Sequence, residues 1–100
     1  MKIWLDDLRT PLPEYWWVQS VNDAKKLIED CERQNEPIEL IDLDYDMGEF
    51  ELRGGTGLNL LKWLSERKTF YPCNVHSTHF TGQFLMEDYI KENWPGSDTK

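Results

Sequence analysis

The stretch Leu40–Glu49, LIDLDYDMGE, decides how the rest of the chain is interpreted. Three aspartates, Asp42, Asp44 and Asp46, stand at every second position, and Glu49 follows a glycine. Because apolar residues alternate with these acids, the stretch predicts a β-strand that runs into a cluster of carboxylates. Neighbouring carboxylates repel one another, and their burial costs free energy. We therefore expect these acids to line a solvated pocket, or to face a bound cation or substrate.

The sequence around this stretch alternates strands with helices. Strands are predicted over residues 2–7, 15–20, 38–46 and 73–78, and helices over residues 20–37, 57–67 and 81–94. The order β-β-α-β-α-β-α implies an α/β domain with right-handed crossovers and a mainly parallel four-stranded sheet. The strand 38–46 is apolar on both faces, which is typical of a central strand covered on both sides.

Local signals support two of these helices. Ser20 followed by Asp23 has the spacing of a capping box, and Thr56 is placed to cap the helix 57–67. The segment 47–57 between strand and helix is rich in glycine and predicts a mobile loop.

Polar residues gather where the predicted strands end. They are Asp6 and Asp7 after the first strand, Asp44 and Asp46 at the end of the third, and His76, Ser77, Thr78 and His79 at the end of the fourth. Ligands of parallel α/β sheets bind beyond the carboxyl ends of the strands. We therefore expect three separate segments to converge on one edge of the sheet.

Composition limits what the protein binds. One hundred residues suit one domain, which we place at 1–94, followed by a flexible tail at 95–100. Nineteen acidic and eleven basic residues give a net charge of −8, which repels duplex nucleic acid and anionic membranes. A divalent cation or a basic partner suits this charge better.

Two features of the chain indicate a cytoplasmic protein. Its two cysteines, Cys31 and Cys73, form neither a metal-ligand spacing nor a disulfide framework, and we expect both to be reduced. The first residues carry two acids where a signal peptide needs an apolar run, and no segment approaches the roughly 20 apolar residues of a membrane span.

The carboxylates at the strand ends suit a metal ion. Asp6, Asp7 and Asp44 offer the oxygen ligands that Mg²⁺ prefers, and this ion commonly binds a substrate phosphate as well. Asp46 is expected to help position a water or the metal. Asp42 lies further back along its strand, and we expect it to be solvated.

The remaining polar residues suit acid/base chemistry on a phosphate. A histidine at a strand end, here His76, acts as a general acid or base near neutral pH. The hydroxyls of Ser77 and Thr78, together with His79, are expected to contact phosphoryl oxygens. Arg9 follows the acid pair and either binds a phosphate through two hydrogen bonds or balances the negative charge.

Four segments, WLDDLRTP, IDLDYDMGE, TGLNLLKWL and NVHST, resemble the cyclic-phosphate-processing receiver-like domains in their order and spacing. These domains are compact relatives of response-regulator receiver domains, and the resemblance covers residues 2–92. It implies a receiver-like (flavodoxin-like, Rossmannoid) three-layer sandwich. It also implies a Mg²⁺-binding acid pair at Asp6 and Asp7, and a phosphoacceptor-like aspartate at Asp44.

The resemblance also implies a phosphate-sensing hydroxyl at Ser77 or Thr78, and the family is proposed to process cyclic phosphates. Family members read Asp-His-Asp after the third strand and His-Ser-x-Asn after the fourth. Here Tyr45 replaces the histidine of the first motif, and His79 replaces the asparagine of the second. The connector 8–15 replaces the first receiver helix, and no counterpart of the receiver lysine is present.

Three functions remain open from the sequence. The first is a phosphoesterase that acts on a cyclic phosphate or nucleotide, with His76 as acid or base and with Asp44 and Asp46 placing a water or a metal. The second is a non-catalytic receiver-like module that binds Mg²⁺, a phosphoryl group or a nucleotide and contacts a partner protein. The third is a small interaction protein with an acidic face.

Overall fold

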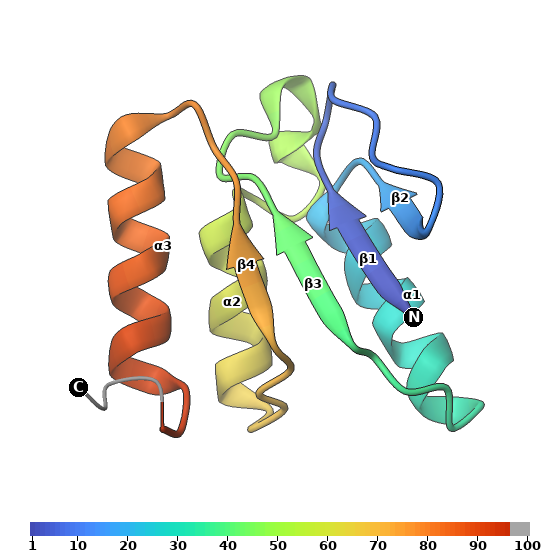
Figure 1. The fold of residues 1–100 in the computed structure, drawn as a ribbon. Coiled ribbons are helices and arrows are strands. Elements are labelled where there is room, and N and C mark those ends of the chain that lie inside the picture. Colours follow the sequence, from blue (N-terminus) through green and yellow to red (C-terminus); the bar gives the residue numbers. More distant parts are fainter. Residues whose placement is uncertain (97–100) are drawn as a thin grey trace.

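The computed structural model describes residues 1–96 and shows a parallel sheet flanked by helices (Figure 1). The elements are β1 (Lys2–Leu5), β2 (Tyr15–Val18), α1 (Val21–Arg33), β3 (Leu40–Leu43), the 3₁₀ helix η1 (Gly48–Leu52), α2 (Gly57–Glu66), β4 (Cys73–Val75) and α3 (Phe80–Asn93). The predicted order of strands and helices is confirmed, and all strand pairs are parallel. The predicted loop 47–57 contains η1, which the sequence analysis does not anticipate.

Two of the predictions concern segments whose limits the structure only partly describes. The domain boundary at residue 94 stays a prediction, and residues 97–100 of the predicted tail lie outside the described residues. No helix within residues 1–96 has both the length and the apolar character needed to cross a bilayer.

Both predicted caps form. The hydroxyl of Ser20 accepts a hydrogen bond from the Asp23 amide at 3.1 Å and so begins α1. Thr56 and Asn59 form a reciprocal capping box at the start of α2. Each cap satisfies amide groups that a helix leaves unpaired in its first turn.

The strand order explains where the helices lie. The sheet runs β2-β1-β3-β4, so the crossover from β2 to β3 and the crossover from β3 to β4 both move in the same direction. Right-handed crossovers that move in one direction place their helices on one face. Figure 1 accordingly shows α1 and α2 behind the sheet and α3 beside β4.

The receiver-like α/β fold is confirmed, but its layers differ from the three that we expected. No helix within residues 1–96 covers the second face of the sheet. The cause is the connector between β1 and β2, which is too short and too rich in proline to form the helix that would cross that face. We call this uncovered side the open face.

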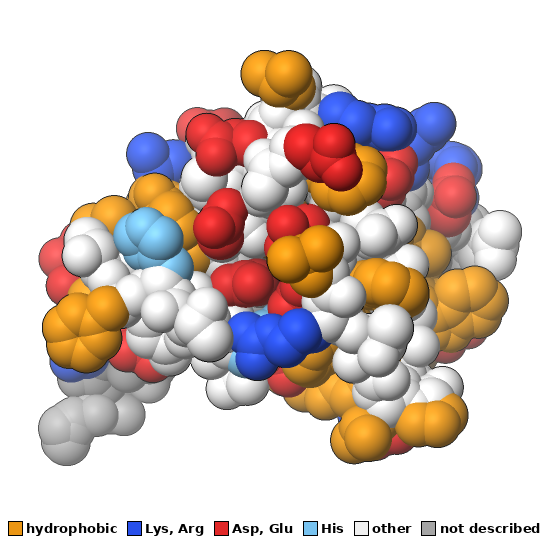
Figure 2. Space-filling model, turned by 90° about the horizontal axis from the view of Figure 1, so that it is seen from above, with side chains coloured by type: hydrophobic (Ala, Val, Ile, Leu, Met, Phe, Trp, Pro, Cys, Tyr) orange, Lys and Arg blue, Asp and Glu red, His pale blue; other side chains and the backbone are white. Residues whose placement is uncertain are grey.

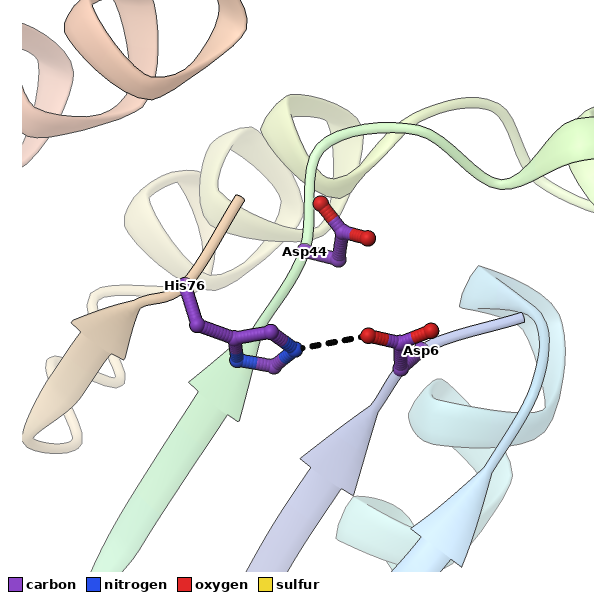
Figure 3. Close-up of side chains that lie close together, drawn as sticks. All are labelled: Asp6, Asp44 and His76. Carbon is purple, nitrogen blue, oxygen red and sulfur yellow. Dashed lines mark hydrogen bonds and ion pairs between the residues drawn. The ribbon is translucent and has the colours of Figure 1, made fainter. Parts of the chain in front are cut away.

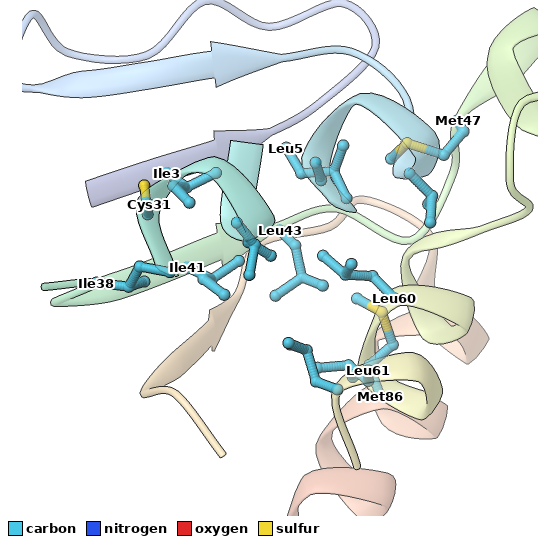
Figure 4. Packing of buried hydrophobic residues seen from close by; sticks show 14 of the residues in the cluster. Ile3, Leu5, Cys31, Ile38, Ile41, Leu43, Met47, Leu60, Leu61 and Met86 are labelled. Atoms are coloured by element: carbon cyan, nitrogen blue, oxygen red, sulfur yellow. The ribbon is translucent and has the colours of Figure 1, made fainter. Parts of the chain in front are cut away.

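The core lies between the sheet and the helices (Figure 4). Ile3 pairs with Ile41 and Leu5 with Leu43, and all four side chains are fully buried on the covered face. Helices α1, α2 and α3 complete this core through Val21, Ala24, Ile28, Cys31, Leu60, Leu61, Leu64 and Met86.

The open face carries the alternate residues of the same strands. Trp17, Trp4, Asp42 and Asn74 lie in register across all four strands. This row is aromatic over β2 and β1 and polar over β3 and β4. The sheet therefore presents an aromatic and polar surface on the side that the helices leave uncovered.

Candidate functional site

Three segments that are distant in the sequence meet at the carboxyl edge of the sheet. Asp6 follows β1, Asp44 follows β3 and His76 follows β4; the side chains of Asp6 and His76 point toward each other, and Asp44 lies next to them (Figure 3). One ligand atom from each side chain lies within 4.8 Å of the other two. The strand order brings them together because the carboxyl ends of parallel strands share an edge.

Asp6 is held by more partners than any other acid of this edge. It is 1% exposed, and its Oδ1 accepts hydrogen bonds from the amides of Leu8 and Arg9 at 2.9 and 2.8 Å. Its Oδ2 lies 2.9 Å from His76 Nε2 and 3.6 Å from Arg9 Nε. Desolvation raises the pKa of Asp6, but the two amides and His76 outweigh it, and the net pKa is lowered. Asp6 is therefore ionised.

The imidazole of His76 is fixed on three sides. Its Nδ1 lies 2.6 Å from Asp42 Oδ1, and its Nε2 faces Asp6. Its ring stacks on Trp4, with centroids 3.9 Å apart and planes 9° from parallel. A neutral imidazole donates one hydrogen bond, so bonds to both carboxylates require either the imidazolium or a proton on one carboxylate. The two contacts therefore fix the orientation of the imidazole between Asp6 and Asp42.

Asp42 corrects an expectation from the sequence. We expected it to be solvated, but it is 7% exposed and faces His76 and Asn74 on the open face. The Asn74 amide donates to both Asp42 oxygens at 3.3 Å. Because side chains alternate along a strand, Asp42 lies on the face opposite to Ile41 and Leu43. The alternation alone does not show that this face lacks a helix, so the sequence did not predict the contact with His76.

The other acids lie beside this group. Asp44 is 7% exposed, and its Oδ1 accepts the amide of Tyr45 at 2.7 Å. Asp46 is exposed and accepts the amide of Gly48 at 2.9 Å. Desolvation, followed by the charges of Asp6, Asp46 and Asp44, raises the pKa of Asp7. Viewed from above the strand ends, acidic side chains gather at the middle of this edge (Figure 2).

This donor set fits a hard divalent cation. Asp6, Asp44 and His76 each bring a ligand atom within 4.8 Å of the others, and Asp7 is a nearby carboxylate whose pKa is raised by burial and then by the charges of Asp6, Asp46 and Asp44, which a cation would offset. His76 contacts Asp6 through the oxygen Oδ2. A cation bound by Asp6 would therefore share that carboxylate with the imidazole.

The predicted substrate-binding residues divide into two groups. Arg9 forms the first group and lies beside the acidic cluster, because its amide bonds to Asp6 and its half-exposed guanidinium lies beside the same carboxylate. Ser77 accepts the amide of His79 at 3.0 Å, which leaves its hydroxyl proton free to donate. Thr78 is exposed next to it.

His79 has a local role that the sequence analysis did not recognise. Its Nδ1 accepts the amide of Gly82 at 2.9 Å, so its imidazole caps the first turn of α3. Its ring also lies 4.8 Å from the ring of Tyr45. Asparagine, the residue that the resemblance implies at this position, is itself a preferred N-cap residue, so histidine and asparagine can both cap α3 here.

Tyr45 packs against the start of α3. A Cβ added at Gly82 would lie 2.3 Å from the Tyr45 ring, so the glycine is needed for this close approach. The tyrosine therefore occupies the space between β3 and α3. Of the two histidines, His76 and His79, only His76 bonds to the carboxylates of Asp6 and Asp42.

Comparison with protein families supports this description. No curated protein and no solved structure gives a significant match to the chain. A family model described as the cyclic-phosphate processing receiver domain matches residues 1–92, which include every residue of the site. The chain therefore belongs to the family of cyclic-phosphate processing receiver domains.

Proposed function

We propose that the protein is a phosphoesterase that opens cyclic phosphates by general acid/base catalysis. One observation carries the proposal, namely that the His76 imidazole is held between Asp6 and Asp42 within a cluster of acidic side chains at the carboxyl edge of the sheet. A histidine fixed in this way is oriented for proton transfer before a substrate arrives.

The reaction would run as a balanced hydrolysis. A water oxygen forms a bond to phosphorus while the bond from phosphorus to one ring oxygen breaks. The leaving oxygen would replace Asp6 Oδ2 as the hydrogen-bond partner of His76 Nε2 and take its proton, while Asp44, which has a carboxylate oxygen within 4.8 Å of an imidazole nitrogen, takes the proton of the water. The product is a phosphate monoester, and proton exchange with solvent restores both groups.

Positive charge and hydrogen-bond donors for the phosphoryl oxygens come from the rim of the pocket. The Arg9 guanidinium is half-exposed beside Asp6 and would bind these oxygens. The hydroxyls of Ser77 and Thr78 would add donors from the opposite side. Asp46 would orient the attacking water.

Mg²⁺ is part of this proposal. Asp6, Asp7 and Asp44 would hold the ion, and Mg²⁺ at such a site supplies positive charge against a phosphoryl group. Because His76 contacts Asp6, loading the ion would also alter the surroundings of the imidazole.

A non-catalytic module remains the second candidate. It is favoured by the replacement of the family histidine by Tyr45 and by the use of the His79 ring Nδ1 as a helix cap. With His76 as the only bonded histidine of the pocket, the domain would bind a cyclic phosphate or another phosphorylated ligand and present it to a partner protein.

Phosphorus NMR distinguishes the two candidates. The wild-type protein should convert a 2′,3′-cyclic phosphate into a monoester, and His76→Ala should slow the conversion roughly 10²–10⁴-fold. His79→Asn is the matched control, since it keeps a helix cap and should keep the rate. Binding without turnover, unaffected by His76→Ala, would establish the module instead.

A titration with Mg²⁺ tests the ion site separately. Amide signals of residues 6, 7 and 44 should shift selectively, and the folded state should gain thermal stability because the ion binds only that state. Asp44→Asn should abolish the selective shifts, whereas Glu29→Gln on the exposed side of α1 should not. Diffuse shifts that follow total ionic strength would contradict the site.

A further inference from the structure

Trp17 lies on the open face next to the site, and the proposed mechanism does not use it. Its side chain is directed by the register of β2 with β1, in which Trp17 pairs with Trp4. The residue is 41% exposed, although an indole is among the largest apolar groups in proteins. An exposed aromatic ring beside a polar site is a recurrent feature of ligand recognition.

The Trp17 ring is held in place rather than loosely exposed. Its Nε1–H donates to the backbone oxygen of Asp6 at 2.8 Å. This bond fixes the orientation of the ring and ties it to the residue that anchors the pocket. Within residues 1–96, no aromatic ring or cation stacks on this indole.

Trp4 shows by contrast what a satisfied indole looks like on the same face. His76 stacks on it in parallel, and Tyr15 meets it edge-on with centroids 5.5 Å apart. Its Nε1–H donates to the Arg9 backbone oxygen. The two tryptophans are neighbours in the sheet. A flat ring of a ligand would lie on Trp17 as the His76 ring lies on Trp4.

One residue separates this surface from the proposed chemistry. Asp6 accepts the Trp17 indole with its backbone oxygen and contacts His76 with its carboxylate. In a nucleoside 2′,3′-cyclic phosphate, one ribose ring separates a flat aromatic base from the phosphorus. Trp17 pairs with Trp4, and His76 stacks on Trp4, so a single molecule of this kind would place its base over Trp17 and its phosphate at His76.

The charge of the protein limits the size of that molecule. With a net charge of −8, the protein repels polyanions, and each added phosphate increases the repulsion. A nucleoside cyclic phosphate carries one negative charge, and stacking of its neutral base provides affinity that does not depend on charge.

We propose that the Trp17 indole is a base-binding subsite and that the ligand is a mononucleoside 2′,3′-cyclic phosphate. This inference rests on the proposed function, because it assumes that the cyclic phosphate lies at His76. It adds the chemical class of the ligand and a specificity residue that lies outside the acidic pocket.

The test compares a nucleoside 2′,3′-cyclic phosphate with 1-O-methylribose 2′,3′-cyclic phosphate, which lacks the base. Binding is followed by the indole N–H signals in NMR spectra. We expect the base-free compound to bind roughly 10–100-fold more weakly, the usual effect of one base stacked on an aromatic ring. Only the nucleoside should shift the Trp17 signal.

Variants of two adjacent tryptophans provide the matched comparison. Trp17→Ala should bind both compounds equally weakly. Trp17→Phe should keep part of the preference for the nucleoside, and it replaces the alanine variant in the test if that variant does not fold. Trp16→Ala should keep the full preference, since Trp16 pairs with Ile3 on the other side of the same strand and is 60% exposed.

Failure of this proposal is distinct from failure of the proposed function. If both compounds bind alike and are both opened, the base subsite is wrong and the phosphoesterase stands. If neither compound binds, both proposals fail. If an RNA oligomer with the same terminal nucleotide binds more tightly than the mononucleotide, the restriction to a small ligand is wrong.

Discussion

The two faces of the sheet use the same four strands for different purposes. On the covered face, Ile3, Leu5, Ile41 and Leu43 are fully buried in a dry core against the helices. On the open face, their immediate neighbours include Trp4 and Asp42, which hold His76 by stacking and hydrogen bonding. Stability comes from burial on one side, and chemistry from fixed polar contacts on the other.

This division follows from topology. Parallel sheets usually have helices on both faces, which makes both faces apolar. Here both crossovers run in one direction, so their helices cover one face of the sheet. The side chains of the open face do not pack against a helix. A fold that omits one helix thus gains a surface on which a histidine and an aromatic row can be placed beside the strand ends.

The sharpest way to break the comparison is to shorten one side chain on each face of β3. Ile41→Ala should lower the free energy of unfolding by about 2–5 kcal/mol, because it leaves a cavity in the core. Leu40→Ala, one residue earlier and only partly buried, should cost much less. Urea unfolding measures both, and equal losses would mean that the open face also packs as a core.

The second prediction concerns function on the open face. Asp42→Asn should lower kcat about 10²-fold with a smaller change in KM, because the neutral amide holds the His76 ring in its orientation less strongly than the carboxylate does. Asp42 acts here as a positioning residue. Leu40→Ala, on the same strand and face, is the control and should keep kcat. A loss in KM alone would indicate that Asp42 serves binding instead.

The third prediction concerns the helix caps at the edge where the two faces meet. Ser20→Ala should destabilise the protein by about 0.5–2 kcal/mol, and His79→Ala by a similar amount. His79→Asn should restore the loss, since asparagine caps as well. Thermal unfolding measures these differences. Instability of His79→Asn equal to that of His79→Ala would show that the contact with Tyr45 matters more than the cap.

The smallest expected effect lies in a polar network on the covered side, far from the site. Arg67 donates to Glu32 at 2.6 Å, and Tyr71 also donates to Glu32. The bond from Arg67 lowers the pKa of Glu32 against the opposing effect of desolvation, and the Tyr71 hydroxyl adds to it. Stability from this group is therefore present above the ordinary pKa of 4.5 and is lost as the pH falls through the lower folded value.

The pKa of Tyr71 is shifted in the opposite direction to that of Glu32. Desolvation and then the bond to Glu32 raise its pKa to about 12, so its contribution is present below pH 10 and is lost as the pH rises toward 12. Glu32→Gln should flatten the acid limb of a plot of unfolding free energy against pH, and ligand binding should not change. An unchanged acid limb would show that other carboxylates dominate acid unfolding.

Much of the site is predictable from strand periodicity alone. Acids after the first and third strands and a histidine after the fourth have to share an edge if the strands are parallel, and the structure brings Asp6, Asp44 and His76 together there. The chemical roles of these three residues do not follow from their positions, and the experiments above test them.

The rest depends on information that is not local. The position of Asp42 on an uncovered face follows from the directions of two crossovers, which no residue near Asp42 encodes. The cap at His79 depends on where α3 begins, and the packing of Tyr45 depends on Gly82, many residues away in the chain. Such contacts depend on tertiary structure, whereas the periodicity of a strand is a property of the local sequence.

The central position of β1 has a consequence for how the chain folds. Lys2 pairs with Tyr15 on one side and with Leu40 on the other, and β4 pairs with β3 from Ile41 and Cys73 to Leu43 and Val75. Without a hairpin, the pairing of β1 with β3 and the pairing of β3 with β4 each have to close a long loop, which slows folding relative to helical proteins. During synthesis the apolar first strand waits for β3 to emerge, and charged residues beside such a strand oppose aggregation. Asp6 and Asp7 follow that strand directly, so these acids are placed to oppose aggregation of the nascent chain.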